Sequence, residues 1–160
     1  MLAICFSAAV IIAMAALVIT LFFKPTEEEI SEAEEHIKAT FYTEIPDEDT
    51  ELFSENMTEY QMQQIIHAMS HQKVKADHKW GKILITQKRV GLMLETLEKN
   101  KDSWEHSAVY ADILNRWYKG DFSKADENHN VIWRMFDGNI GKAEGLLNAV
   151  EELKYLNSEE

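Results

Sequence analysis

Residues 58–69 read TEYQMQQIIHAM and contain both the start signal and the repeat of an amphipathic helix. Thr58 and Gln61 have the spacing of a capping box, in which each side chain bonds the backbone of the other residue. The apolar residues that follow recur at intervals of three and four, which places them on one helical face. They are Met62, Ile65, Ile66 and Met69. This stretch therefore predicts a helix that buries one side.

Comparable signals occur on both sides of this stretch. Thr26 precedes a pattern that ends near Tyr42, and a short last helix carries Val150, Leu153 and Leu156. Further predicted helix starts are Thr86, Ser103 and Ser123. The only β-prone triplet is at residues 83–85, and three residues do not make a sheet. We therefore predict an all-α fold, with a bundle of about five helices after the N-terminal segment.

The N-terminal segment, residues 1–23, contains no charged side chain. A helix over residues 2–23 would be roughly 33 Å long, against a hydrocarbon core of about 30 Å. A cleavable signal peptide would have a charged start, a shorter apolar run and small residues at its end. Here the run ends in the bulky residues 19–23. We predict a single uncleaved transmembrane helix, which makes the membrane a partner through residues 2–23, and a cleaved signal is the alternative.

The orientation of this anchor depends on its flanking charges. Lys24 is the only basic residue on the C-terminal side before Lys38. A short uncharged N-terminus followed by a long tail favours translocation of the tail. We therefore expect a single-pass protein of the cell membrane whose soluble domain is extracytoplasmic.

Charge divides the rest of the chain. The net charge is −12, which excludes nucleic acid as the main partner because phosphates would repel the protein. Residues 25–59 hold thirteen acids and one base, whereas residues 71–101 hold eight bases and three acids. We divide the chain into a transmembrane anchor (1–24), an acidic juxtamembrane helix and linker (25–56) and a helical domain (57–160).

Several short motifs carry a resemblance to a known family. They are HQKV at 71–74, WG at 80–81, TxxR at 86–89, YxxILNRW at 110–117, GDF at 120–122 and HN at 129–130. With these motifs, most of residues 57–156 resembles an uncharacterised family of small, N-terminally membrane-anchored proteins from spore-forming Gram-positive bacteria. The resemblance implies an anchored single domain and no known activity. In addition, GDFSKA at 120–125 resembles the inter-helix turn of one tetratricopeptide hairpin.

Two histidines offer the only arrangement typical of a chemical site. His67 and His71 are four residues apart, so a helix presents them on one face. The stretch HAMSH lacks the glutamate of a zinc-protease motif, and nothing in the sequence places His106, Asp112 or His129 beside the pair. We interpret the pair as polar residues of a surface or groove and predict no metal and no cofactor. The alternative is a metal-dependent hydrolase that uses His67 and His71 with a third ligand.

Trp80 lies beside a glycine in a break between two predicted helices. Basic residues surround this break in an otherwise acidic chain, and we take the segment as the binding surface. Its candidate residues are His71, Lys75, Lys79, Trp80, Lys82 and Arg89. An exposed tryptophan would supply contact area, and the lysines would steer an acidic partner. The predicted function is a membrane-anchored helical protein-interaction module with an unknown protein partner. The alternative is that Trp80 fills the core and the lysines are solvated.

Overall fold

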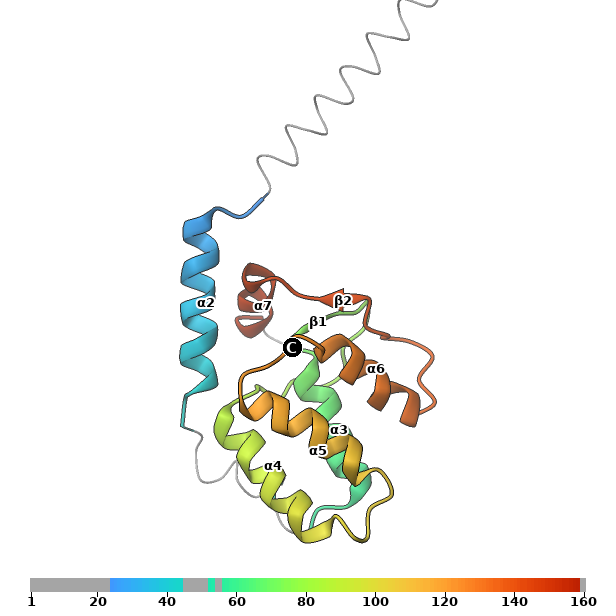
Figure 1. The fold of residues 1–160 in the computed structure, drawn as a ribbon. Helices are drawn as coiled ribbons and strands as arrows, with labels where there is room; N and C mark the ends of the chain where they lie inside the picture. Colours follow the sequence, from blue (N-terminus) through green and yellow to red (C-terminus); the bar gives the residue numbers. More distant parts are fainter. Residues whose placement is uncertain (1–23, 45–51, 54–55, 159–160) are drawn as a thin grey trace, which may run out of the picture.

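The computed structural model describes residues 24–44, 52–53 and 56–158. In these residues the elements are α2 (Glu27–Phe41), α3 (Glu59–Ser70), β1 (Val74–Lys75), α4 (Gln87–Asn100), α5 (Ser107–Tyr118), α6 (Ala125–Met135), β2 (Gly145–Leu146) and α7 (Ala149–Leu156). The described part is thus mostly helical, as predicted, with six helices and one small sheet that was not predicted (Figure 1). No helix among the described residues is long and apolar enough to cross a membrane, and the predicted anchor at residues 2–23 lies outside them.

The helix starts follow from local capping. Thr58 Oγ1 accepts from the Gln61 amide at 3.2 Å, and the Thr58 amide donates to Gln61 Oε1 at 2.8 Å. The same reciprocal box opens α2 at Thr26 and α7 at Asn148. Thr86 caps α4 by accepting from the Arg89 amide at 3.1 Å. These contacts satisfy amide groups that a helix start would otherwise leave without a partner.

The start of α5 is different. Ser103 was predicted to begin this helix, but α5 begins at Ser107. The carboxylate of Glu59, at the start of α3, accepts from the backbone amides of Glu105 and His106 at 2.9 and 2.8 Å. The preceding turn is therefore capped by a residue from another helix, which a local sequence pattern cannot show.

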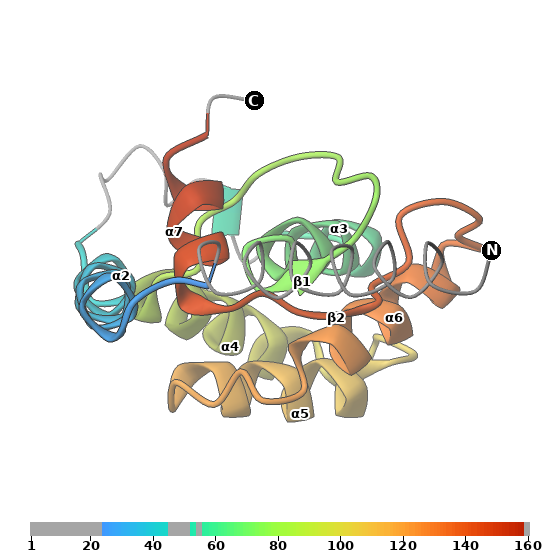
Figure 2. The same ribbon diagram turned by 90° about the horizontal axis from the view of Figure 1, so that it is seen from above.

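The helices pack in pairs. Helix α3 lies against α6, α4 against α5, and α2 against α7 (Figure 2). The predicted tetratricopeptide-like hairpin would place α5 against α6, whereas each of these helices packs mainly against a different neighbour. The core between the helices holds large buried side chains, among them Met62, Ile66, Met93, Leu114, Trp117 and Ile132.

The acidic segment contributes to this core. Phe41 in α2 and Phe53 in the linker are buried members of the main cluster. The rings of Phe41 and Phe122 meet edge to face, with centroids 5.7 Å apart. Residues 25–56 therefore supply side chains to the interior of the domain that we predicted to span 57–160.

The small sheet brings two distant segments together. Val74 pairs with Leu146 and Lys75 with Gly145, antiparallel. The Glu144 amide also donates to the Lys75 carbonyl at 2.8 Å. This pairing holds the loop after β1 beside the loop before β2, and both loops contact the site described next.

Candidate metal-binding site and adjoining aromatic pocket

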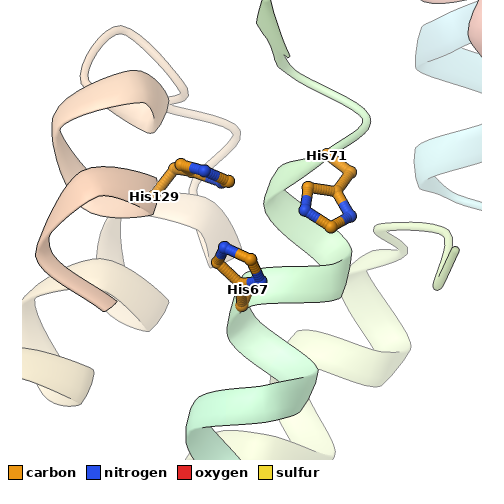
Figure 3. A group of neighbouring side chains, drawn as sticks. All are labelled: His67, His71 and His129. Atoms are coloured by element: carbon orange, nitrogen blue, oxygen red, sulfur yellow. The ribbon is translucent and has the colours of Figure 1, made fainter. Parts of the chain in front are cut away.

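Three histidines gather between α3 and α6 (Figure 3). His67 comes from α3, His71 is the residue directly after that helix, and His129 comes from α6. One ring nitrogen of each lies within 4.8 Å of the others. His67 and His129 stack with ring centroids 4.4 Å apart, and His71 lies 4.7 Å from His67. The structure thus brings one of the three possible third residues, His129, to the predicted pair. It also buries His71 fully, although the sequence favoured a surface or groove position.

Two backbone carbonyls orient the rings. His71 Nδ1 lies 2.9 Å from the oxygen of Gly81, and His129 Nε2 lies 2.9 Å from the oxygen of Gly141. A carbonyl oxygen only accepts, so each of these nitrogens carries the hydrogen of a neutral ring. The assigned tautomers leave a lone pair on His71 Nε2 and on His129 Nδ1.

The two carbonyls come from glycines in unusual conformations. Gly81 and Gly141 have φ angles of 80° and 83°, a region that other residues rarely adopt. A side chain on Gly141 would place its Cβ 2.7 Å from the backbone oxygen of His78. Glycine is therefore required at Gly141 for the loop to reach the ring of His129.

The cluster contains polar atoms without a partner. Nε2 of His67 and Nε2 of His71 are buried and have no hydrogen-bond partner among the described residues. Nδ1 of His129 lies 2.8 Å from Ser70 Oγ, which also lies 2.5 Å from the carbonyl oxygen of His67. The hydroxyl has one hydrogen for these two acceptors. An unpaired buried nitrogen costs free energy, so the site has capacity for a further ligand.

Electrostatics keep the rings uncharged at neutral pH. Burial, together with the neighbouring histidines, lowers the pKa of His67 to about 3. Burial also lowers the pKa of His71 to about 4, although the hydrogen bond to the Gly81 carbonyl acts in the opposite direction. Burial likewise lowers the pKa of His129. Lys79 contributes to the lowered pKa of His71 and of His129, and its Nζ donates to the His71 carbonyl at 2.8 Å. Neutral imidazole is the form that binds metal ions.

A pocket of about 590 Å³ opens beside the cluster. Its lining is mainly aromatic and amide, with one carboxylate. The lining residues are Tyr60, Gln63, Gln64, His67, Trp80, Trp133, Met135, Phe136, Asp137, Gly138, Asn139 and Ile140. We call this the aromatic pocket. His67 is the cluster member in its lining, so the pocket connects the histidines with solvent.

The predicted basic surface is largely engaged by the chain itself. Lys75 pairs with Glu151 of α7 at 2.9 Å. Lys79 Nζ lies 4.5 Å from the ring centroid of Tyr155, and Lys82 donates to the carbonyl of Leu156 at 3.2 Å. Arg89 donates to the Leu84 carbonyl at 3.0 Å.

Trp80 is the exception in this segment. It is 63 % exposed and lines the aromatic pocket, so it does not fill the core.

The far wall of the pocket was not predicted. Trp133 donates from Nε1 to the Ile140 carbonyl at 2.8 Å, and a Cβ on Gly138 would lie 2.4 Å from its ring. Asp137 adopts a φ of 53° in the same turn. The glycines at 138 and 141 could have indicated a tight loop here, but nothing in them shows which side chains the loop would meet.

A family of unknown function (DUF6241) matches residues 66–157, which is more than half of the chain. The chain belongs to this family. The matched part of this DUF6241 protein contains all three histidines and Trp80. No curated protein and no solved structure matches the chain. The family description assigns no activity.

Proposed function

We propose that this DUF6241 protein is a membrane-anchored helical binding module whose aromatic pocket takes a basic, apolar segment of another protein. The exposed ring of Trp80 carries this proposal. It is 63 % exposed beside a cavity that Tyr60, Trp133 and Phe136 also line. Tryptophan and tyrosine in a pocket are typical anchors of interfaces, because they bury a large area with few rotatable bonds.

The pocket chemistry favours a cationic partner. Asp137 is the only carboxylate among the described residues of the lining, which contains no lysine or arginine. The whole chain carries a net charge of −12, which attracts a basic segment over longer range. A lysine or arginine of the partner would gain further from the aromatic faces, and Gln64 and Asn139 offer amides to its backbone.

This proposal revises the predicted acidic partner. That prediction depended on Lys75, Lys79 and Lys82 facing solvent together. In the structure all three contact α7 or the residues after it, so less of their charge is available for a partner. Trp80 remains as the accessible aromatic side chain of the predicted surface.

The placement of the module belongs to the same proposal. An uncharged run at residues 1–23 and a single flanking lysine support a single-pass anchor with the domain outside the cytoplasm. The module would then meet partners near the membrane surface.

A metal-dependent hydrolase is the second candidate function. The position of His129 beside His67 and His71 favours it. Among the described residues no carboxylate joins this cluster to serve as a base, which leaves binding ahead of catalysis.

A displayed library of random peptides tests the module. The full chain in detergent micelles is the bait, and the dissociation constants of enriched peptides are measured by fluorescence anisotropy. We expect enriched peptides to pair lysine or arginine with an aromatic or aliphatic residue. Trp80→Ala should weaken their binding by about 30-fold, the loss typical of a central anchor.

Two further variants sharpen the test. Asp137→Asn keeps the volume and tolerates the positive φ, so it should remove the preference for basic peptides while leaving the fold intact. Tyr118→Ala is the matched control, because Tyr118 is also exposed but does not line the aromatic pocket. Enrichment of acidic peptides, or equal binding by the Trp80→Ala variant, would reject the proposal.

A further inference from the structure

We infer that His67, His71 and His129 together bind one divalent transition-metal ion, with Zn²⁺ as the representative ion. The inference rests on the cluster of three rings and not on the peptide site. It concerns the histidine cluster beside the aromatic pocket, whereas the peptide proposal concerns Trp80 and the other residues that line the pocket.

The hydrogen bonds of the cluster resemble those around metal-binding histidines. Such histidines usually donate from one ring nitrogen to a carbonyl or carboxylate, which orients the other nitrogen toward the metal. His71 donates to the Gly81 carbonyl and His129 to the Gly141 carbonyl, both at 2.9 Å. The nitrogens that this leaves for a ligand are His71 Nε2 and His129 Nδ1.

The third ligand nitrogen, Nε2 of His67, would not have to break a hydrogen bond to bind a metal. His67 Nε2 is buried without a partner among the described residues, as is His71 Nε2. Two buried nitrogens without hydrogen-bond partners are costly, and a metal ion would satisfy both at once. A single water molecule is the competing occupant, because it could donate one hydrogen to each.

The Ser70 side chain allows the third metal bond, from Nδ1 of His129, to form. Its hydroxyl lies between His129 Nδ1 at 2.8 Å and the His67 carbonyl at 2.5 Å. A metal on the lone pair of His129 Nδ1 requires the Ser70 hydroxyl to turn away from that nitrogen, and its hydrogen can then go entirely to the carbonyl. Metal binding therefore leaves no polar group of Ser70 unsatisfied.

The three ring nitrogens would have to move only a short distance toward one another to bind a metal ion. Zinc–nitrogen bonds of about 2.0–2.1 Å in a tetrahedral site place the ligand nitrogens roughly 3.3 Å apart. One ring nitrogen of each of the three histidines now lies within 4.8 Å of the others. His67 is the ring that can turn, because its Nε2 has no bond to break and its side chain borders the pocket.

The donor set selects the class of ion. Three imidazoles suit Zn²⁺, Cu²⁺, Ni²⁺ or Co²⁺, whereas Ca²⁺ and Mg²⁺ require oxygen ligands that the described cluster lacks. Three protein ligands leave a fourth position for another group, and His67 borders the aromatic pocket through which such a group could approach. Such an open position is characteristic of sites that bind water or an exogenous group.

The positive charge of Lys79 weakens the binding of a metal ion at this site. Its ammonium group donates to the His71 carbonyl at 2.8 Å, and burial lowers its pKa. A positive charge near the site reduces its affinity for a cation, so the affinity should rise when the charge is removed. Lys79→Gln tests this point and should tighten Zn²⁺ binding several-fold.

The direct test uses the full, untagged chain in detergent micelles after treatment with a chelator. Competition with a chromophoric zinc indicator should show one equivalent bound, with micromolar or tighter affinity. X-ray absorption at the zinc edge should show three imidazoles, and Co²⁺ should give the intense visible bands of a tetrahedral site. His67→Gln should weaken binding by about a hundredfold or more, since one of three ligands is lost.

His78→Gln is the matched control. His78 is exposed, lies outside the cluster and contacts Asp77, so its replacement should leave the affinity unchanged. The absorption spectrum of the unmutated protein decides the matter if the buried variants His71→Gln or His129→Gln do not fold. Failure to bind Zn²⁺ or Co²⁺, or fewer than three imidazoles around the ion, would overturn the inference and favour a buried water. Trp80→Ala should retain the metal, which separates this result from the peptide proposal.

Discussion

Lys73 donates from Nζ to Oε1 of Glu152 at 2.5 Å, and each side chain is more than nine-tenths buried. Gln72 donates to the same carboxylate oxygen at 2.9 Å. The ammonium also lies 4.2 Å from the ring centroid of Phe122. Burial lowers the pKa of Lys73, while the carboxylate of Glu152 opposes that change. This ion pair joins α7 to the segment that follows α3.

We predict that Glu152→Gln destabilises the protein strongly. The substitution leaves the Lys73 ammonium buried without its counter-charge, which costs about 3–5 kcal/mol in comparable pairs. Urea denaturation followed by circular dichroism measures the free energy of unfolding. Glu151→Gln is the control, because Glu151 is more exposed and glutamine can keep its capping box. The control should cost less than about 1 kcal/mol, and equal losses would contradict this role for the ion pair.

The histidine cluster predicts a pH dependence for the metal-free protein. The unfolded chain has histidine pKa values near 6.5, whereas in the folded state they are about 3 for His67 and about 4 for His71. Between these values the unfolded state binds more protons, so stability is complete above pH 6.5 and falls as the pH decreases toward 4. The loss at pH ~5 should reach at most about 2 kcal/mol for each histidine.

Urea midpoints measured in chelator at several pH values test this prediction. His67→Gln should reduce the slope, because one titrating group is removed. A free energy of unfolding that stays constant from neutral to mildly acidic pH would show that the rings are protonated at little cost.

Gly141 and Gly120 provide a comparison of strain with steric conflict. Both have positive φ angles, 83° and 76°, but only at Gly141 would a Cβ meet another atom, the His78 carbonyl at 2.7 Å. Gly120→Ala should therefore cost about 1 kcal/mol, the strain of the left-handed conformation alone. Gly141→Ala should cost about 2–3 kcal/mol, because the loop must also move. Thermal melting of the two variants compares them, and equal melting temperatures would contradict the steric argument.

A truncation tests the proposed domain boundary. We predict that residues 55–160 fold by themselves, because they contain five capped or patterned helices. The fragment should melt cooperatively but below residues 26–160, since it loses Phe41 and Phe53 from the core. Differential scanning calorimetry of both fragments measures the difference. A cooperative transition in the longer fragment alone would make the acidic segment an essential part of the domain.

The N-terminal run predicts firm membrane attachment. Its 23 uncharged residues should keep the full chain in the membrane fraction after washing with high salt and carbonate. Fractionation of expressing cells and sequencing of the protein's N-terminus provide the measurement. A soluble product that begins near Thr26 would show that the segment is a cleaved signal.

Local patterns predicted most of the helices. The boxes at Thr26 and Thr58 and the cap at Thr86 each depend on residues three positions apart, so a short window of sequence contains the whole interaction. The spacing of His67 and His71 likewise placed both on one face. Where the cap came from elsewhere, as Glu59 does for the turn before α5, the predicted boundary was wrong by four residues.

The sequence by itself determined the helical class, the apolar N-terminal run and the histidine pair, because these depend on composition and short-range spacing. Only the tertiary structure decided that His129 joins the pair and that carbonyls from two glycine loops orient the rings. The same packing directed Lys79 and Lys82 to α7 and left Trp80 exposed. These contacts join residues far apart in the chain, so they follow from how whole helices pack and not from any local preference of the residues involved.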